Sequence, residues 1–386
     1  MSKALFLKGM SQYNVLRYFT DELMKGFEQQ GWETEVLDFY LGDEEANRRR
    51  LEELQQCPPD VAIAFNGICQ ADVRRYLDIP YVGFMVDPPA MHHIRYVDWA
   101  DKDYAICIDR HHATIMNQYY TNMGGAFFVP HGGSVARQQV PYGDRTIDVA
   151  FSGSYHASQG YLDEMQSVLE PYECQVAFAV LTIMEERNLE MEQALECFLT
   201  ENQIPFLSEE FTNLCLRYYN IDSYVRAFYR EELLRALTDN GIVVDIYGNG
   251  WDAFDCANKE NLRIHPPVDY EESLEIMANT RISLNSIPSY KAGAHERIFS
   301  AMVNGSLCVT DPSEYLSEQF ADGEEIVYYQ RDNIQKAARE VLYYLENEDE
   351  AEKITQKARQ VALRSHTWEA RAKDVIAILQ ECIGVK

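Results

Sequence analysis

The sequence predicts an α/β protein made of two domains, each built around a parallel β-sheet. Three observations lead to this prediction. Strand-like and helix-like patterns alternate over the first 130 residues, and a second alternating series runs from residue 148 to residue 329. Such switching between the two periodicities is typical of α/β units. Between the two series, residues 130–146 are rich in Pro, Gly and polar residues and show no periodicity, so we expect them to link the domains.

The first domain is expected to span residues 1–140. Short apolar and β-branched runs mark its strands, and helical patterns lie between most of them. One such pattern covers residues 15–30 and is terminated by Gly31. The predicted strands are residues 4–7, 33–37, 60–65, 81–86, 104–108 and 126–129.

The second domain is expected to span residues 145–370. After its first strand, residues 155–240 are rich in Leu, Glu, Met and Ala at helical spacing, which predicts a helical insertion. Residues 371–386 are expected to form a C-terminal helix. The predicted strands are residues 148–151, 243–247, 262–264, 281–285, 306–310 and 325–329.

Composition argues against several classes of partner. The net charge of −28 argues against nucleic acid, because binding it requires clustered Lys and Arg. The nine cysteines contain no C-x-x-C pair, which indicates reduced thiols and a cytoplasmic location. No apolar run approaches the roughly 18 residues of a membrane span, and the apolar stretch near residue 5 is too short for a signal peptide.

The pattern of residues 291–303 predicts that this segment forms a phosphate-binding site. A loop opens a short helix, and a helix N-terminus at the carboxyl end of a parallel strand suits an anion. Arg297 in its first turn adds a guanidinium that can pair with a phosphate through two hydrogen bonds. A surface salt bridge with Glu296 is the alternative. Lys291, His295 and Glu296 would face the sugar of a donor, although His295 could simply belong to the helix cap.

Three other strand ends are candidates for the same site. Because ligands bind at the carboxyl ends of parallel strands, the loops that follow these strands are expected to lie together. A plain β-turn is the alternative for the first loop, and a role in the core is the alternative for Trp251. The candidate residues are Gly153, Ser154 and Tyr155, then Asn249, Gly250 and Trp251, and finally Asn285 and Ser286.

Asp87 is a candidate general base in the first domain. It ends a buried strand and is followed by two prolines that fix the direction of the chain. The alternative is that Asp87 caps a helix. His92 and His93 lie just beyond it and are further candidate bases.

Several segments resemble a known family. Residues 130–133 (PHGG) and 147–160 (IDVAFSGSYHASQG) are similar to a junction in group-1 glycosyltransferases. Residues 221–237, 243–251 and 263–285, with 291–330, resemble the spore-maturation CgeB-type family, which joins a group-1-like C-terminal domain to a distinctive N-terminal domain. That family's C-terminal "hTweaRa" helix also appears, as residues 365–371 (SHTWEAR). The C-terminal resemblance covers about residues 145–375, and the N-terminal half rests mainly on residues 86–89.

The resemblance implies the GT-B architecture, in which two Rossmann-like domains face a cleft. It implies a hexosyltransferase that moves a sugar from a nucleotide-diphosphate sugar, UDP-linked by analogy, to a protein or surface-glycan acceptor. No metal or other cofactor is implied. The chain's acidic D-x-D motif, residues 101–103, which could hold a metal ion, lies in the first domain, away from the predicted phosphate site. The segment around Pro266 and Val268 would contact the base.

One departure from the group-1 pattern affects the catalytic prediction. The two glutamates expected eight positions apart fall on Ala292 and Ser300, so both are missing. Ser300 could hold the donor ribose only weakly, and the stereochemical outcome cannot be carried over. The alternatives are a catalytically degenerate protein that binds a nucleotide sugar or glycan, and a nucleotide-sugar epimerase.

Overall fold

The computed structural model describes residues 2–385. Contacts between residues divide the chain into two compact units, and each is described by itself. Unit 1 comprises Met1–Gly132, Phe206–Leu216 and His366–Lys386, and unit 2 comprises Gly133–Pro205 and Arg217–Ser365.

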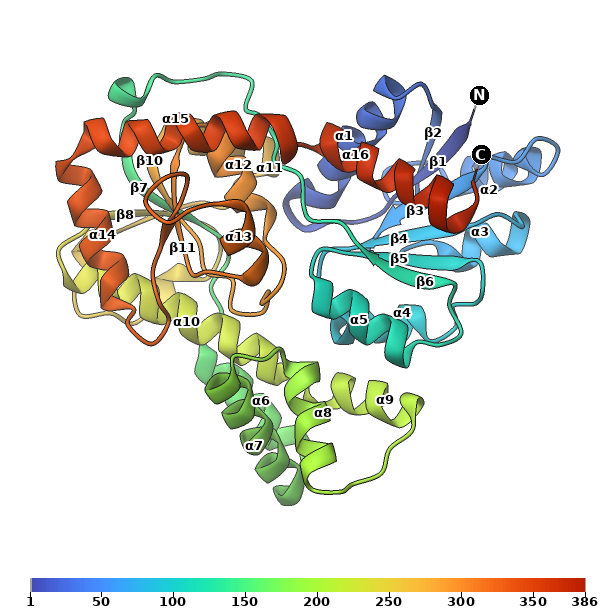
Figure 1. The fold of residues 1–386 in the computed structure, drawn as a ribbon, viewed down its shortest axis with the longest axis horizontal. Helices are drawn as coiled ribbons and strands as arrows, with labels where there is room; N and C mark the ends of the chain where they lie inside the picture. Colours follow the sequence, from blue (N-terminus) through green and yellow to red (C-terminus); the bar gives the residue numbers. More distant parts are fainter. Residues whose placement is uncertain (1, 386) are drawn as a thin grey trace. The chain divides into compact units, whose positions relative to one another are not determined.

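Unit 1 contains a parallel sheet of six strands in the order β2-β1-β3-β4-β5-β6 (Figure 1). The two central strands β3 and β4 are buried along their whole length, because helices on both faces require apolar side chains on both sides. The strands are β1 Lys3–Lys8, β2 Glu33–Asp38, β3 Val61–Phe65, β4 Tyr81–Met85, β5 Asp103–Cys107 and β6 Gly125–Phe128.

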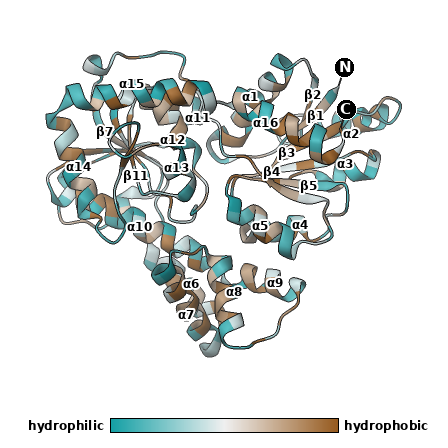
Figure 2. Cartoon of the chain, viewed as in Figure 1, coloured by the Kyte–Doolittle hydropathy of each residue, from teal (hydrophilic) through white to brown (hydrophobic). Residues whose placement is uncertain are grey.

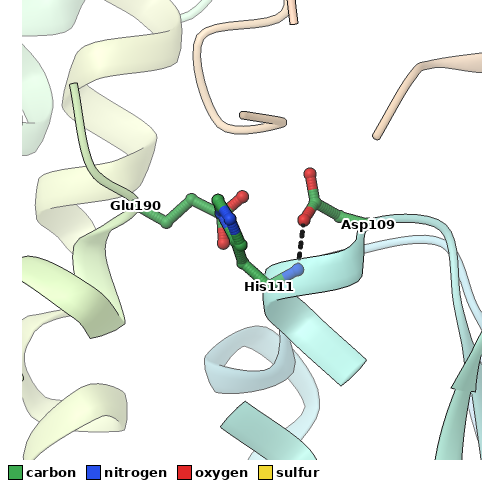
Figure 3. Close-up of side chains that lie close together, drawn as sticks. All are labelled: Asp109, His111 and Glu190. Carbon is green, nitrogen blue, oxygen red and sulfur yellow. Dashed lines mark hydrogen bonds between the residues drawn. The ribbon is translucent and has the colours of Figure 1, made fainter. Parts of the chain in front are cut away.

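Some helices of unit 1, namely α2, α5 and α16, begin with a side chain that caps the first turn. Asp109, for example, accepts a hydrogen bond of 2.7 Å from the backbone N–H of His111 at the start of α5 (Figure 3). The helices are η1 Gln12–Asn14, α1 Val15–Gln29, α2 Glu44–Leu54, α3 Gln70–Tyr76, η2 Pro89–His92, α4 His93–Tyr96, α5 Arg110–Tyr119, α16 Trp368–Ile378 and η6 Leu379–Ile383, with most of α9 Ser208–Tyr218.

The C-terminal helix α16 belongs to the core of unit 1. Trp368 is 2% exposed, and its ring centroid lies 4.8 Å from that of Phe19 and 5.6 Å from that of Phe65. A Cβ atom added at Gly26 of α1 would lie 2.6 Å from Ala372 Cβ, so the missing side chain lets the two helices approach.

Unit 2 contains a second parallel sheet of six strands in the order β12-β11-β10-β7-β8-β9. Its core is formed by apolar residues of the strands and of the helices that cover them, and Figure 2 shows the hydrophobic residues gathered on the strands. The strands are β7 Ile147–Ser152, β8 Val244–Tyr247, β9 Leu262–His265, β10 Thr280–Leu284, β11 Leu307–Thr310 and β12 Val327–Tyr328.

Helices form the rest of unit 2, including most of the predicted insertion. The insertion contains no strand within residues 155–240 of the described chain; Glu190, drawn in Figure 3, starts α8 with a capping box. The helices are η3 Tyr142–Asp144, α6 Ser158–Val168, α7 Pro171–Arg187, α8 Met191–Glu201, α10 Asn220–Asp239, η4 Trp251–Ala253, η5 Lys259–Asn261, α11 Tyr270–Ala278, α12 Glu296–Val303, α13 Glu314–Gln319, α14 Gln335–Glu346 and α15 Glu348–Ser365.

The predicted fold class, α/β with two parallel sheets, is confirmed, and each predicted strand is present within a few residues of its expected bounds. The units divide the chain differently from the expected limits at 140, 145 and 370. Residues 133–140 lie in unit 2, and residues 366–370 join residues 371–386 in unit 1. None of the helices within residues 2–385 combines the length and apolar character needed to cross a membrane.

Candidate functional site

The predicted strand-end loops of unit 2 follow β7, β8 and β10, which are neighbours in the sheet. Because all three strands run in the same direction, their carboxyl ends lie on one edge of the sheet. This edge therefore collects the loops at 153–155, 248–251 and 285–291.

The loops after β7 and β8 are locked together by main-chain hydrogen bonds. The N–H of Gly153 donates to Tyr247 O at 2.9 Å, and the N–H of Tyr155 donates to Asn249 O at 2.8 Å. Gly248 has φ of +156°, and a Cβ atom there would lie 2.3 Å from Gly153 O. Only glycine fits this approach, so the two loops form one unit of structure.

Two aromatic residues of these loops act in packing. Trp251 is 1% exposed and donates its Nε1–H to Gly153 O at 2.8 Å, which agrees with the alternative of a residue in the core. Tyr155 is buried against Trp251, and its hydroxyl donates to Glu231 Oε1 at 3.2 Å. Asn249 and Gly250 are exposed and Ser154 is half-buried, so these three are the accessible members of the loops.

Arg297 reaches the glycine loop from the first turn of α12. Its Nη1 donates to Ser152 O at 2.9 Å, and a Cβ atom at Gly153 would lie 3.4 Å from that nitrogen. The guanidinium therefore lies beside the loop after β7. A cavity of about 10 Å³, enough for one water molecule, lies between Arg297, Asn285 and Ser152.

The residues that precede Arg297 shape the start of α12. His295 is the N-cap, and its Nδ1 accepts from the N–H of Arg297 at 3.5 Å. The same ring pairs with Glu296, which is 5% exposed. This arrangement matches the alternative reading of His295 as a cap residue and places Glu296 inside the fold.

Lys291 is a buried cation in the loop after β10. Its side chain is 5% exposed, and within residues 2–385 its Nζ has no hydrogen-bond partner. Its backbone N–H donates to Glu190 Oε1 at 3.1 Å, so the loop is held by the start of α8. Burial, followed by the charge of Arg331, lowers the pKa of Lys291 to about 8.

Other predicted donor residues lie in different surroundings. Asn285 is 1% exposed and Ser286 is half-buried at the end of β10. Ser300 is fully buried, and its hydroxyl bonds to Ser134 N and to the Tyr270 hydroxyl, so it does not face an open site. Pro266 is exposed and Val268 is half-buried after β9.

In unit 1, Asp87 forms a polar cluster with two residues from neighbouring segments. Its Oδ2 lies 3.0 Å from His92 Nε2 and accepts from Asn66 Nδ2 at 2.9 Å. Asn66 follows β3, has φ of +52°, and accepts from the N–H of Val86 through its own side chain. The short helix after Asp87 begins with Pro88 as its N-cap, without a side-chain cap bond, so Asp87 does not cap it.

His93 is not part of this cluster. It is 5% exposed, its Nδ1 lies 3.0 Å from the Tyr120 hydroxyl, and burial lowers its pKa. A neutral imidazole held in this way has a role in packing. The structure therefore brings Asp87 and His92 together and keeps His93 apart.

Comparisons with known proteins place this geometry in context. Residues 226–377 match the family described as glycosyl transferase-like. This part of the chain is similar to glycosyl transferase-like domains. The match covers α10 to α16, which includes Arg297 and the loops after β8 and β10. No significantly similar sequence was found among curated proteins.

Solved structures of glycosyltransferases share the fold over the whole chain. A glycosyltransferase from Rickettsia africae is 10% identical, with a TM-score of 0.55, covering 100% of this chain and 99% of that one. Sucrose-phosphate synthase from Thermosynechococcus elongatus is 9% identical, with a TM-score of 0.54 and full coverage of both chains. HepE of Anabaena, solved with UDP-glucose, is 10% identical, with a TM-score of 0.55, covering 98% and 100%. At these identities the likeness establishes the GT-B fold.

The matched residues 226–377 contain a cation that the sequence patterns missed. Arg230 of α10 donates from Nη1 to Ser154 O and lies over the Phe151 ring, with 5.6 Å from Cζ to the centroid. No motif links residue 230 to residue 153, because the helical insertion separates them along the chain. The sequence of residues 229–237, YREELLRAL, predicted only a helix.

Asp103, the second carboxylate of the D-x-D segment at residues 101–103, is held by structural contacts. Asp103 is 0% exposed and accepts from Gln70 Nε2 at 2.7 Å, and Arg74 Nη2 lies 2.7 Å from it. Its oxygens are therefore occupied by side chains of unit 1.

Asn66 is the other residue that the sequence patterns missed, since a single Asn after a strand is a common turn residue.

Proposed function

We propose that this protein transfers a hexose from a nucleoside-diphosphate sugar to a hydroxyl group of a protein or glycan acceptor, as a CgeB-type glycosyltransferase. The observation that carries the proposal is Arg297, which lies within the matched residues 226–377 and presents its guanidinium to the glycine loop after β7. The UDP-glucose bound to HepE supports a UDP-linked donor for this chain as well.

The departing diphosphate would be stabilised by unit 2. The positive end of α12 and the guanidinium of Arg297 neutralise charge that develops on the phosphate oxygens as the glycosidic bond breaks. Gly153 leaves space for the phosphates beside this cation. In our proposal these groups replace a metal ion, and the protein needs no other cofactor.

The acceptor would be activated by unit 1. With Nε2–H donated to Asp87, Nδ1 of His92 carries the lone pair and can take the proton of the acceptor hydroxyl. Asp87, held by Asn66, fixes this tautomer and stabilises the imidazolium that forms. The nine free thiols of the chain support a cytoplasmic location.

A second candidate function is binding without transfer. The positions of the two expected glutamates hold Ala292 and Ser300, and both side chains are fully buried. Neither can replace a carboxylate that touches a donor sugar. A degenerate protein that binds a nucleotide sugar would show this arrangement.

One experiment separates the two candidates. Purified protein is incubated with UDP-, GDP-, ADP- and dTDP-hexoses, with and without EDTA, and release of the nucleoside diphosphate is measured. The proposed function predicts slow release from at least one donor, unchanged by EDTA. Binding of a donor without any release indicates the second candidate. Release that requires Mn²⁺ or Mg²⁺ contradicts metal-independent stabilisation of the leaving group.

A further inference from the structure

Two arginines approach the same glycine loop from different helices of unit 2. Arg297 of α12 donates to Ser152 O at 2.9 Å, and Arg230 of α10 donates to Ser154 O. The two carbonyl groups flank Gly153, which has φ of +151°. The loop therefore holds one guanidinium at each of its ends.

These two guanidinium groups lack a counter-charge. Within residues 2–385, neither Arg230 nor Arg297 forms an ion pair with a carboxylate. On the same helix α10, Arg226 lies 3.0 Å from Asp222 and Arg235 lies 3.2 Å from Glu231. Arg230 thus differs from the arginines one turn before it and one turn after it.

The environment of Arg230 opposes its charge. Burial comes first, followed by the charges of Arg297 and Arg226, and together they lower the pKa of Arg230 to about 9. Like charges held close together without a carboxylate are unfavourable, so an anion that lies between these two half-buried guanidinium groups would be bound strongly. Their charge is opposite in sign to the net charge of the chain, which is −28.

The arrangement suits two linked phosphate groups. Guanidinium groups bind phosphate through paired N–H donors, and two of them on either side of one loop can each take one phosphate. A single phosphate would engage one guanidinium fully and leave the repulsion between the two largely in place.

We propose that Arg230 and Arg297 together bind the two phosphates of a nucleoside diphosphate, so that Arg230 is a donor-binding residue which makes the site select diphosphates over monophosphates. The proposal rests on the proposed function, and it names the leaving group that the site requires. The proposal also assigns a role to the helical insertion. Its last helix, α10, contains Arg230, whose side chain contacts the loop after β7.

The test uses inorganic pyrophosphate and orthophosphate as probes, because they need no knowledge of the base. Titration calorimetry compares the wild type with Arg230→Met, which keeps the apolar stem over Phe151, and with Arg230→Lys. Arg235→Met on the same helix is the matched control. We expect Arg230→Met to lose about tenfold to a hundredfold in pyrophosphate affinity, and less than about threefold in orthophosphate affinity. Arg230→Lys should be intermediate, and Arg235→Met should bind both probes like the wild type.

Other outcomes overturn the inference. Unchanged pyrophosphate affinity in Arg230→Met, or in Arg230→Lys if the Met variant does not fold, removes Arg230 from the site while the proposed function stands. Equal losses for both probes indicate that Arg230 only supports the loop. A wild type that binds neither pyrophosphate nor any nucleoside diphosphate overturns both this inference and the proposed function.

Discussion

Arg297 joins two sequence features that lie far apart along the chain. The sequence predicts a role for Arg297 in phosphate binding because it lies in the first turn of a helix. It predicts the same role for Gly153 because this residue follows a strand. In the structure, Arg297 Nη1 lies beside Gly153 and donates to Ser152 O. This contact uses one nitrogen of the guanidinium, and an arginine offers further N–H donors in a planar fork that a lysine lacks.

Substitution of Arg297 should therefore affect turnover more than folding. A charge-assisted hydrogen bond to phosphate is worth roughly 1.5–3 kcal/mol, so Arg297→Ala should slow donor cleavage by about tenfold to a hundredfold. Arg297→Lys should lose less. Arg137→Ala, at a surface arginine that pairs with Glu271, is the control and should change neither rate nor stability measurably. Normal turnover by Arg297→Ala would place the diphosphate elsewhere.

The pair of Asp87 and His92 leads to a second prediction. Asp87→Asn can donate to His92 and so favours the wrong tautomer, and transfer should fall by about 10²–10⁴. Binding of a nucleoside diphosphate should stay unchanged. His92→Gln should lose a similar factor, whereas Asp98→Asn at an exposed position should behave like the wild type.

The comparison of these variants identifies the base. If His92→Gln keeps most of the activity while Asp87→Asn loses it, the carboxylate of Asp87 acts directly. Full activity in both variants would exclude this cluster from catalysis.

The buried ammonium of Lys291 makes stability depend on pH. Its pKa falls from 10.5 in the unfolded chain to about 8 in the folded protein, so its charge opposes folding below pH 8. Between about pH 8 and pH 10.5 the unfolded state binds more protons, and this cost disappears as the pH rises. Lys291→Met should therefore be more stable than the wild type at pH 7, by an amount on the order of 2 kcal/mol.

Urea denaturation at pH 7 and pH 10 measures this difference. The advantage of the Met variant should shrink at pH 10. An advantage that is the same at both pH values would show that Lys291 is not buried as an unpaired cation.

Among the structural elements, the loops after β7 and β8 of unit 2 are held together by close backbone contacts. Gly153 and Tyr155 donate to Tyr247 and Asn249, and Gly248 passes directly over the carbonyl group of Gly153. The position of Arg297 depends on this arrangement, because its partner Ser152 O lies at the start of the same loop. Any change that separates the two loops should disturb the proposed phosphate site.

Gly248→Ala tests this dependence. The new Cβ atom would lie 2.3 Å from Gly153 O at φ of +156°, so we expect a loss of more than about 1 kcal/mol in the free energy of unfolding and weaker nucleotide binding. Gly160→Ala in α6 is the matched control, because no atom lies within 4 Å of its added Cβ. It should leave stability unchanged or slightly higher. A Gly248→Ala variant as stable as Gly160→Ala would contradict the close approach of the loops.

At the scale of the whole chain, periodicity predicted the two sheets because parallel strands buried on both faces are continuous apolar runs. Strand ends also predicted which loops of unit 2 share an edge, since parallel strands end on one side. Local patterns carry no information on which helix packs against which sheet. For this reason the place of α16, through Trp368, and that of Arg230 beside Ser154 came only from the structure. The cluster of Asn66 with Asp87 was missed for a different reason, because a single Asn after a strand is a common turn residue.

The proposed function and the roles of Arg297 and Arg230 all depend on one property, which is the binding of a nucleoside diphosphate by the wild-type chain. Thermal unfolding in the presence of UDP, GDP, ADP and dTDP at millimolar concentration measures it directly. At 100 times its dissociation constant, a ligand that binds only the folded state adds about 2.7 kcal/mol, which gives a clear rise in Tm. We expect such a rise with at least one nucleoside diphosphate and a smaller one with the matching monophosphate. The absence of a rise with every diphosphate would contradict the glycosyltransferase assignment.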